Sequence, residues 1–219
     1  GRYAYCWPRD AVFITKAMDI LNMDKETEKF YKIFCKKTQS KNGMWEQRFY
    51  TDCKLAPAWG YQVDETASVI YGVYEHYLVT KNEKFLKDTL PMCEKAISFL
   101  KHYVKDWLDL DAEEMEEQLR KNGKERKIHV SYDLWEMCEG IHLYSLATIY
   151  SAFATILKIY KVLGKNVSDF DNNRLKEEKI NKNKNEIGML QIELKKYIEE
   201  KMYDDNRKSY VKSLNDRRI

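Results

Sequence analysis

The order of the connections between helical segments constrains the fold of this chain most. Apolar residues recur at helical spacing in six segments, and no period-2 alternation of useful length indicates a strand. Short turns such as 22–24 and 81–82 join the first to the second, the third to the fourth and the fifth to the sixth segment. The other two connections are long, about 25 and about 35 residues. The six segments are Ala11–Leu21, Lys25–Cys35, Val63–Val79, Glu83–Val104, Ile141–Leu163 and Arg174–Met202.

This order predicts an all-α fold of stacked helix hairpins. A short turn makes an antiparallel hairpin, so every long loop enters its hairpin at the same end. The helix after each long loop is the more apolar one, as Ile141–Leu163 illustrates, and the helix after each short turn is more charged. An inner ring of buried helices, backed by an outer and more solvated ring, satisfies this pattern. We therefore expect residues 1–219 to form part of an α/α toroid domain, with its functional site where the long loops converge.

Composition excludes several other classes. The 44% of hydrophobic residues can build one core, and only 8 Gly and 3 Pro favour helices over a β fold with many turns. A net charge of +3 with scattered lysines is no footprint for nucleic acid, and no run of 18 apolar residues indicates a membrane span. The five cysteines are widely spaced, which favours reduced thiols and a cytoplasmic location. The four histidines lack metal-ligand spacing, so we expect no metal, and nothing points to a cofactor.

Carboxylates stand among aromatic rings in the last long loop. The stretch Ser131–Gly140 contains Asp133, Glu136 and Glu139 around Trp135. Aromatic faces stack on the apolar side of a pyranose, and desolvation raises the pKa of a carboxylic acid, which then holds a proton for a glycosidic oxygen. The same residues also fit an aromatic loop with an N-capping acid.

Two further motifs precede helices at the same end of the hairpins. Arg and Asp in Trp7-Pro8-Arg9-Asp10 can bridge neighbouring sugar hydroxyls beside an indole, or can simply be a capping acid and its ion-pair partner. Trp59-Gly60 can place an indole against a ligand, with the glycine allowing close approach, or can be core packing. Asp64, at the next helix start, can complement the helix dipole.

Together these motifs resemble the catalytic domain of glycoside hydrolase family 15, which contains glucoamylases and related α-glucosidases. The resemblance rests on Trp-x-Arg-Asp at 7–10, Trp-Gly-x-Gln-x-Asp-Glu-Thr-Ala at 59–67 and Tyr-Asp-Leu-Trp-Glu at 132–136, in that order. It runs from about Tyr3 to Leu163, and the charged segment after that is only compatible with it. The family fold is an (α/α)6 barrel with its active site at the N-terminal ends of the inner helices.

The resemblance implies a role for each matching residue. Glu136 matches the general acid, and Arg9 with Asp10 matches the pair that grips the non-reducing-end glucose. Where fungal members carry a second acid, this chain has Met137. The other implied substrate-binding residues are Trp59 and Trp135 near the reacting sugar, Asp64 by a looser alignment and Glu139 from proximity alone.

The resemblance also implies an inverting reaction, which needs a catalytic base roughly 6.5–9.5 Å from the acid. In the family this base comes from a later helix pair, and nothing after Leu163 matches its context. We therefore expect a fragment, half a barrel that carries the acid without the base, inactive alone and with apolar surface at its cut edges. Its expected partners are an oligosaccharide or polysaccharide substrate, the remaining half of the barrel and an N-terminal β-sandwich domain of the kind that bacterial members often carry.

The expected activity is exo-hydrolysis of α-glucosidic bonds in maltodextrin-like glucans with release of glucose. Trehalose or an α-1,6 glucan are alternative substrates within the same family. A phosphorylase on a related barrel would need a phosphate site, for which no basic cluster is present. An alternative of another class is a non-catalytic carbohydrate-binding toroid that keeps the aromatic residues without the chemistry.

Overall fold

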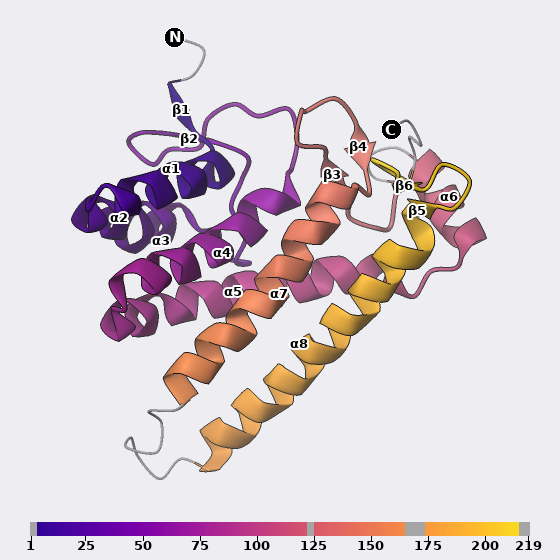
Figure 1. The fold of residues 1–219 in the computed structure, drawn as a ribbon. Coiled ribbons are helices and arrows are strands. Elements are labelled where there is room, and N and C mark those ends of the chain that lie inside the picture. The colour runs from indigo at the N-terminus through magenta and orange to yellow at the C-terminus, as the bar shows by residue number, and fades with distance from the viewer. Residues whose placement is uncertain (1–3, 122–124, 165–173, 215–219) are drawn as a thin grey trace.

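The protein is mostly helical, which confirms the predicted all-α class (Figure 1). The computed structural model describes residues 4–121, 125–164 and 174–214, with the side chains of 174–180 excepted. The helices are α1 (Pro8–Ile20), α2 (Asp24–Lys29), the π-helix η1 (Phe30–Cys35), α3 (Lys36–Thr38), α4 (Val63–Thr80), α5 (Glu83–Leu108), α6 (Ala112–Arg120), α7 (Leu143–Gly164) and α8 (Arg174–Lys201). Three antiparallel pairs of two-residue strands join β1 (Tyr5–Cys6) to β2 (Phe49–Tyr50), β3 (Ser131–Tyr132) to β4 (Glu139–Gly140), and β5 (Tyr203–Asp204) to β6 (Ser209–Tyr210).

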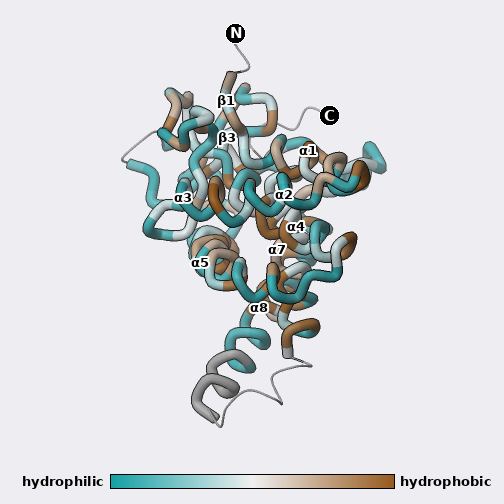
Figure 2. Tube along the Cα trace, turned by 90° about the vertical axis from the view of Figure 1, so that its left-hand side faces the viewer, coloured by the Kyte–Doolittle hydropathy of each residue, from teal (hydrophilic) through white to brown (hydrophobic). Residues whose placement is uncertain are grey.

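The helices form two layers, in the order that the connections predict. Helix α4 packs against α1 and α7, α5 packs against α4 and α7, and α8 packs against α7 and α5. In Figure 1, α5 passes behind α7, and α8 runs beside α7. The hydrophobic residues gather around α4 and α7, and α8 is largely hydrophilic (Figure 2). Closure of these hairpins into a ring stays a prediction.

Helix α7 is apolar because it is a core helix. Among the described helices it alone is long and apolar enough to cross a membrane by length and composition. Its buried side chains, including Leu146, Ile149, Phe153 and Ile156, are fully covered by the neighbouring helices. About half of its most apolar stretch is buried inside the protein, where the helix packs against α4, α5 and α8.

Helix α6 lies outside the six helical segments predicted from the sequence. Residues 109–126, a stretch rich in acidic side chains, contain this helix. Asp111 caps this helix by accepting from the N–H groups of Glu113 and Glu114 at 2.9 Å, and Met115 anchors it with 6% of its surface exposed. The Asp-x-x-Glu capping box was present in the sequence and indicates a helix start.

Helix α1 presents an apolar surface to solvent. Phe13, Ile14, Ile20 and Leu21 are each more than half exposed. Exposed apolar surface of this kind is typical of a face that contacts another protein segment, and its place at the edge of an incomplete ring stays a prediction.

Gly72 allows α4 to approach α1 and η1 closely. A Cβ atom there would lie 2.2 Å from Oη of Tyr31 and 2.8 and 2.9 Å from the two methyl carbons of Val12. We expect Gly72→Ala to lower the free energy of unfolding by about 1–3 kcal/mol through overpacking. Gly188 in α8 has nothing within 4 Å of its Cβ position. Because alanine favours a helix more than glycine does, Gly188→Ala should raise the free energy of unfolding by up to about 1 kcal/mol. Urea denaturation of both variants measures the difference, and equal effects would contradict this account.

Candidate active site

A cavity of about 510 Å³ lies at the N-terminal end of α1 and contains most of the predicted site residues. Its lining comes from residues 5–14 and from the loop at 134–136, which are at least 120 positions apart in the sequence. The predicted residues in the lining are Trp7, Arg9, Asp10, Trp135 and Glu136. The structure therefore brings two of the three motifs to one cavity.

The other predicted residues lie around this cavity without lining it. Asp64 is fully buried behind Arg9, so it can reach a ligand only through that arginine. Trp59 is 71% exposed, and its ring lies 5.5 Å from the guanidinium carbon of Arg48. Glu139 forms an ion pair with Arg126 at 3.2 Å instead of facing the cavity.

The sequence around α1 and α4 explains the position of Arg9. Pro8 occupies the first turn of α1, where its missing N–H costs no hydrogen bond, so Arg9 also lies in that turn. Its Nη1 donates to Oδ2 of Asp64 at 2.7 Å, and its backbone N–H donates to Oε2 of Glu65 at 2.6 Å. Its Nη2 donates to Oδ2 of Asp10 at 3.1 Å. Asp10 lies toward solvent, with 59% of its side chain exposed, so the Arg9–Asp10 pair is the accessible part of the cluster.

Asp64 and Glu65 place two buried carboxyls on one guanidinium. Burial raises the pKa of Asp64, and the charge and hydrogen bond of Arg9 lower it only in part. Burial raises the pKa of Glu65 well above its ordinary value, again with partial compensation from Arg9. The cluster therefore depends on the positive charge of Arg9.

The loop that carries Glu136 is organised by Asp133. The N–H of Glu136 donates to the carbonyl of Asp133 at 2.9 Å, which closes a tight turn. Oδ1 of Asp133 accepts from the N–H groups of Met137 at 2.6 Å and Cys138 at 3.1 Å. Oδ2 pairs with Nζ of Lys212 at 2.7 Å. Glu136 itself has a φ of +58°, a left-handed conformation that an unbranched L-residue adopts only when its surroundings impose it.

The acid loop and the loop before α4 are joined to each other. The N–H of Tyr132 donates to the carbonyl of Tyr61 at 2.8 Å, and Nε2 of Gln62 donates to the carbonyl of Asp133 at 2.6 Å. A Cβ on Gly60 would lie 2.4 Å from the Tyr132 ring. Gly60 therefore allows a close approach to the backbone, as expected, but the group that approaches is the Tyr132 ring and not a ligand.

Removal of the charge of Asp133 should loosen this loop. Burial would raise the pKa of Asp133, but Lys212 and the N–H groups of Cys138 and Met137 outweigh it and hold the pKa below its ordinary value. A carboxyl whose folded pKa is depressed stabilises the fold above its unfolded pKa, about 3.9, and loses that contribution as pH falls through the folded pKa. We expect Asp133→Asn to cost about 2 kcal/mol at neutral pH and progressively less as the pH falls below about 4, in urea denaturation over this pH range.

A matched control for Asp133 exists in an exposed turn. Asp52 also accepts from a backbone N–H and pairs with a lysine, Lys54, at 2.8 Å, but more than half of its side chain is exposed. Asp52→Asn should leave the free energy of unfolding unchanged within error. Equal losses in the two variants would show that Asp133 contributes no more than a surface acid.

Asp133, Lys212 and Arg48 are residues of this site that the sequence interpretation did not assign. Asp133 stood inside the Tyr-Asp-Leu-Trp-Glu string and could have been identified as an acid ahead of a turn. Lys212 follows α8, and only the docking of that segment, with the N–H of Leu143 on the carbonyl of Lys212 at 2.9 Å, brings it here. Arg48 stands in the aromatic stretch Trp45–Tyr50, where its neighbours gave no indication of its contacts.

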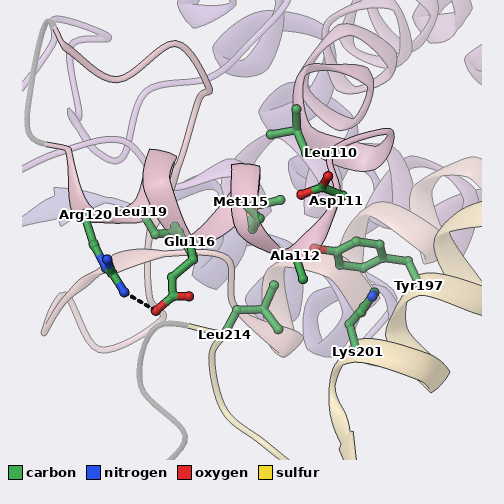
Figure 3. Close-up of a pocket in the computed structure, with 10 residues that line it drawn as sticks. All are labelled: Leu110, Asp111, Ala112, Met115, Glu116, Leu119, Arg120, Tyr197, Lys201 and Leu214. Carbon is green, nitrogen blue, oxygen red and sulfur yellow. Dashed lines mark hydrogen bonds and ion pairs between the residues drawn. The ribbon is translucent and has the colours of Figure 1, made fainter.

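A second cavity lies apart from these residues. It has a volume of about 680 Å³ and lies between α6, α8 and Leu214 (Figure 3). Tyr197 and Lys201 of α8 form one side, and Glu116 and Arg120 of α6 are already paired with each other at 2.5 Å (Figure 3). None of the predicted site residues contributes to its lining.

Comparison with known proteins relates the chain to sugar-cleaving enzymes. No protein-family model matches it. A protein of Methanocaldococcus jannaschii named an uncharacterized glycosyl hydrolase is 23% identical over 163 residues, which are 74% of this chain. Those residues are 23% of the relative, so the chain spans about a quarter of the curated protein that it matches. The similarity supports a relationship to glycosyl hydrolases.

Proposed function

We propose that this chain forms the acid-bearing part of a glycoside hydrolase that releases glucose from the ends of α-linked glucans with inversion. One observation carries the proposal: the Glu136 carboxyl lines the same cavity as the Arg9–Asp10 pair and two tryptophans. The similarity to a named glycosyl hydrolase supports the same reaction class.

The cavity offers the groups that bind the sugar and protonate the leaving oxygen in glycoside hydrolysis. Arg9 and Asp10 supply a donor and an acceptor, both charged, for neighbouring hydroxyls of one sugar. The indoles of Trp7 and Trp135 give apolar faces on which a pyranose can stack, and Trp135 is 75% exposed. Glu136 has 22% of its side chain exposed, so its carboxyl can reach a leaving oxygen while being partly shielded from water.

The proposed roles follow from this placement. Glu136 donates its proton to the glycosidic oxygen as the bond to the anomeric carbon breaks, and a water activated by a second carboxylate attacks from the opposite face. We propose that this second carboxylate comes from the remaining half of the barrel. Glucoamylase-like cleavage of maltodextrins is the proposed specificity.

Proton NMR of the anomeric signals tests reaction and stereochemistry together. The full-length protein is incubated with maltotriose, and the early spectra should show β-glucose ahead of the equilibrium mixture of anomers. Early α-glucose would contradict inversion. Parallel samples with trehalose and isomaltose decide among the linkages, and binding of all three sugars without any cleavage would favour the carbohydrate-binding alternative.

A further inference from the structure

We propose that Arg48 is a positioning residue of this site, which fixes Trp59 and stabilises the carboxylate that Glu136 becomes when it gives up its proton. This inference rests on the proposed function. It concerns a residue to which neither the motifs nor the comparison assigns a role.

Arg48 lies inside a box of three aromatic rings. Its guanidinium carbon is 5.4 Å from the ring centre of Tyr5 and 5.5 Å from those of Trp7 and Trp59. Cation–π contacts of this kind hold a planar guanidinium between ring faces. Because 71% of Trp59 is exposed, its contact with Arg48 restricts the positions that its indole can take.

A strand pairing and a hydrogen bond to the backbone hold Arg48 between these three rings. It precedes β2, whose Phe49 pairs with Cys6 of β1, and this pairing places Arg48 beside Tyr5 and Trp7. Its Nε donates to the carbonyl of Pro57 at 2.6 Å, and only 9% of the residue is exposed. A side chain that is stacked, hydrogen-bonded and buried in this way has few alternative positions for its remaining nitrogens.

One of those nitrogens faces the proposed acid. Nη1 of Arg48 lies 3.9 Å from Oε2 of Glu136, which is an ion-pair distance and too long for a hydrogen bond. The carboxyl therefore stays available to a leaving oxygen. After proton transfer to that oxygen, the carboxylate left on Glu136 has a fixed positive charge beside it, and a charge preorganised for the product of the transfer also lowers the barrier.

The other charged groups near Glu136 are committed elsewhere. Arg9 pairs with Asp10, Asp64 and Glu65, and Asp133 of the same turn pairs with Lys212. At the far end of the loop Glu139 pairs with Arg126. Arg48 is thus the cation whose contact with Glu136 the structure records.

Chemical rescue of a truncated variant tests the proposal in the full-length protein. Arg48→Ala should lower kcat/KM about 10²-fold, because both the charge and the support of Trp59 are removed. Guanidinium ion at about 20 mM, far below denaturing concentrations, should raise kcat/KM of this variant at least tenfold by binding between the three aromatic rings. Urea has the same planar shape without the charge and should restore none. Rescue by urea as well as guanidinium, or by neither, would overturn the role of the charge.

A second pair of variants keeps the test decisive if Arg48→Ala does not fold. Arg48→Lys retains the charge and Arg48→Met does not, while both fill the box. At equal melting temperature the lysine variant should have at least tenfold the kcat of the methionine variant, and equal kcat values would contradict the proposal. Glu136→Gln separates the two levels: if it is fully active the proposed function fails, whereas an inactive Glu136→Gln with unaffected Arg48 variants defeats only the present inference.

Discussion

Glu136→Gln is expected to lower kcat of the full-length protein on maltotriose by about 10²–10⁴-fold with little change in KM. Glutamine keeps the shape of the side chain and its place in the cavity, but it has no proton of suitable acidity to give to the glycosidic oxygen. The side chains proposed to hold the sugar, those of Arg9, Asp10, Trp7 and Trp135, are unchanged in this variant. The loss should therefore appear in the chemical step and leave binding intact.

A substrate with a leaving group that needs no proton provides the control. α-Glucosyl fluoride departs as fluoride, so Glu136→Gln should retain most of its activity on it, within about tenfold of the wild type. Comparable losses on maltotriose and on the fluoride would point to damage of the site as a whole. Full activity on maltotriose would remove Glu136 from the role of acid.

The helices could be predicted because their determinants are local. The segment Val63–Val79 matches α4, which ends one residue later at Thr80, and Glu83–Val104 falls within α5. In α5 the period of apolar residues matches the one face that is buried, whereas α4 is buried on all sides in its first half. The capping box at Asp111 was equally local and was overlooked among the surrounding charges.

The arrangement of the site could be predicted only as far as loop order determines it. The short and long connections predict that the loops before α1, α4 and α7 lie at one end, and the cavity lined by Trp7 and Glu136 lies there. Pairwise contacts between distant residues leave no trace in a single sequence. Arg48 meets Glu136 through the pairing of β1 with β2, and Lys212 meets Asp133 after the chain has passed through α8.

Buried charge shows the same limit in another form. The sequence interpretation placed Asp64 either at a helix start or in the pocket, and the structure places it in the first turn of α4 beneath Arg9. Asp64 and Glu65 are both fully buried, which no propensity indicates. Both carboxyls have Arg9 as their ion-pair partner.

Removal of Arg9 is therefore expected to have the largest effect on stability. Arg9→Met keeps the length of the side chain but leaves the carboxyls of Asp64 and Glu65 without a cation. We expect a loss of about 3–5 kcal/mol in the free energy of unfolding at neutral pH, measured by urea denaturation. Lys16→Met provides a control on the same helix, because the Lys16–Glu75 pair at 2.7 Å is partly solvated and its loss should cost about 1 kcal/mol or less.

The pH dependence of this loss distinguishes buried charge from lost packing. The pKa values of Asp64 and Glu65 are already raised by burial, and removal of Arg9 takes away the charge that lowers them in part. A carboxyl with a raised folded pKa weakens the fold as pH rises from its unfolded pKa, about 4, up through the folded pKa. The deficit of Arg9→Met should therefore be smallest near pH 4 and grow toward neutral pH. Adding Glu65→Gln should recover part of the stability and flatten the profile, whereas a deficit that is constant with pH would show that Arg9 stabilises the fold by packing instead of charge.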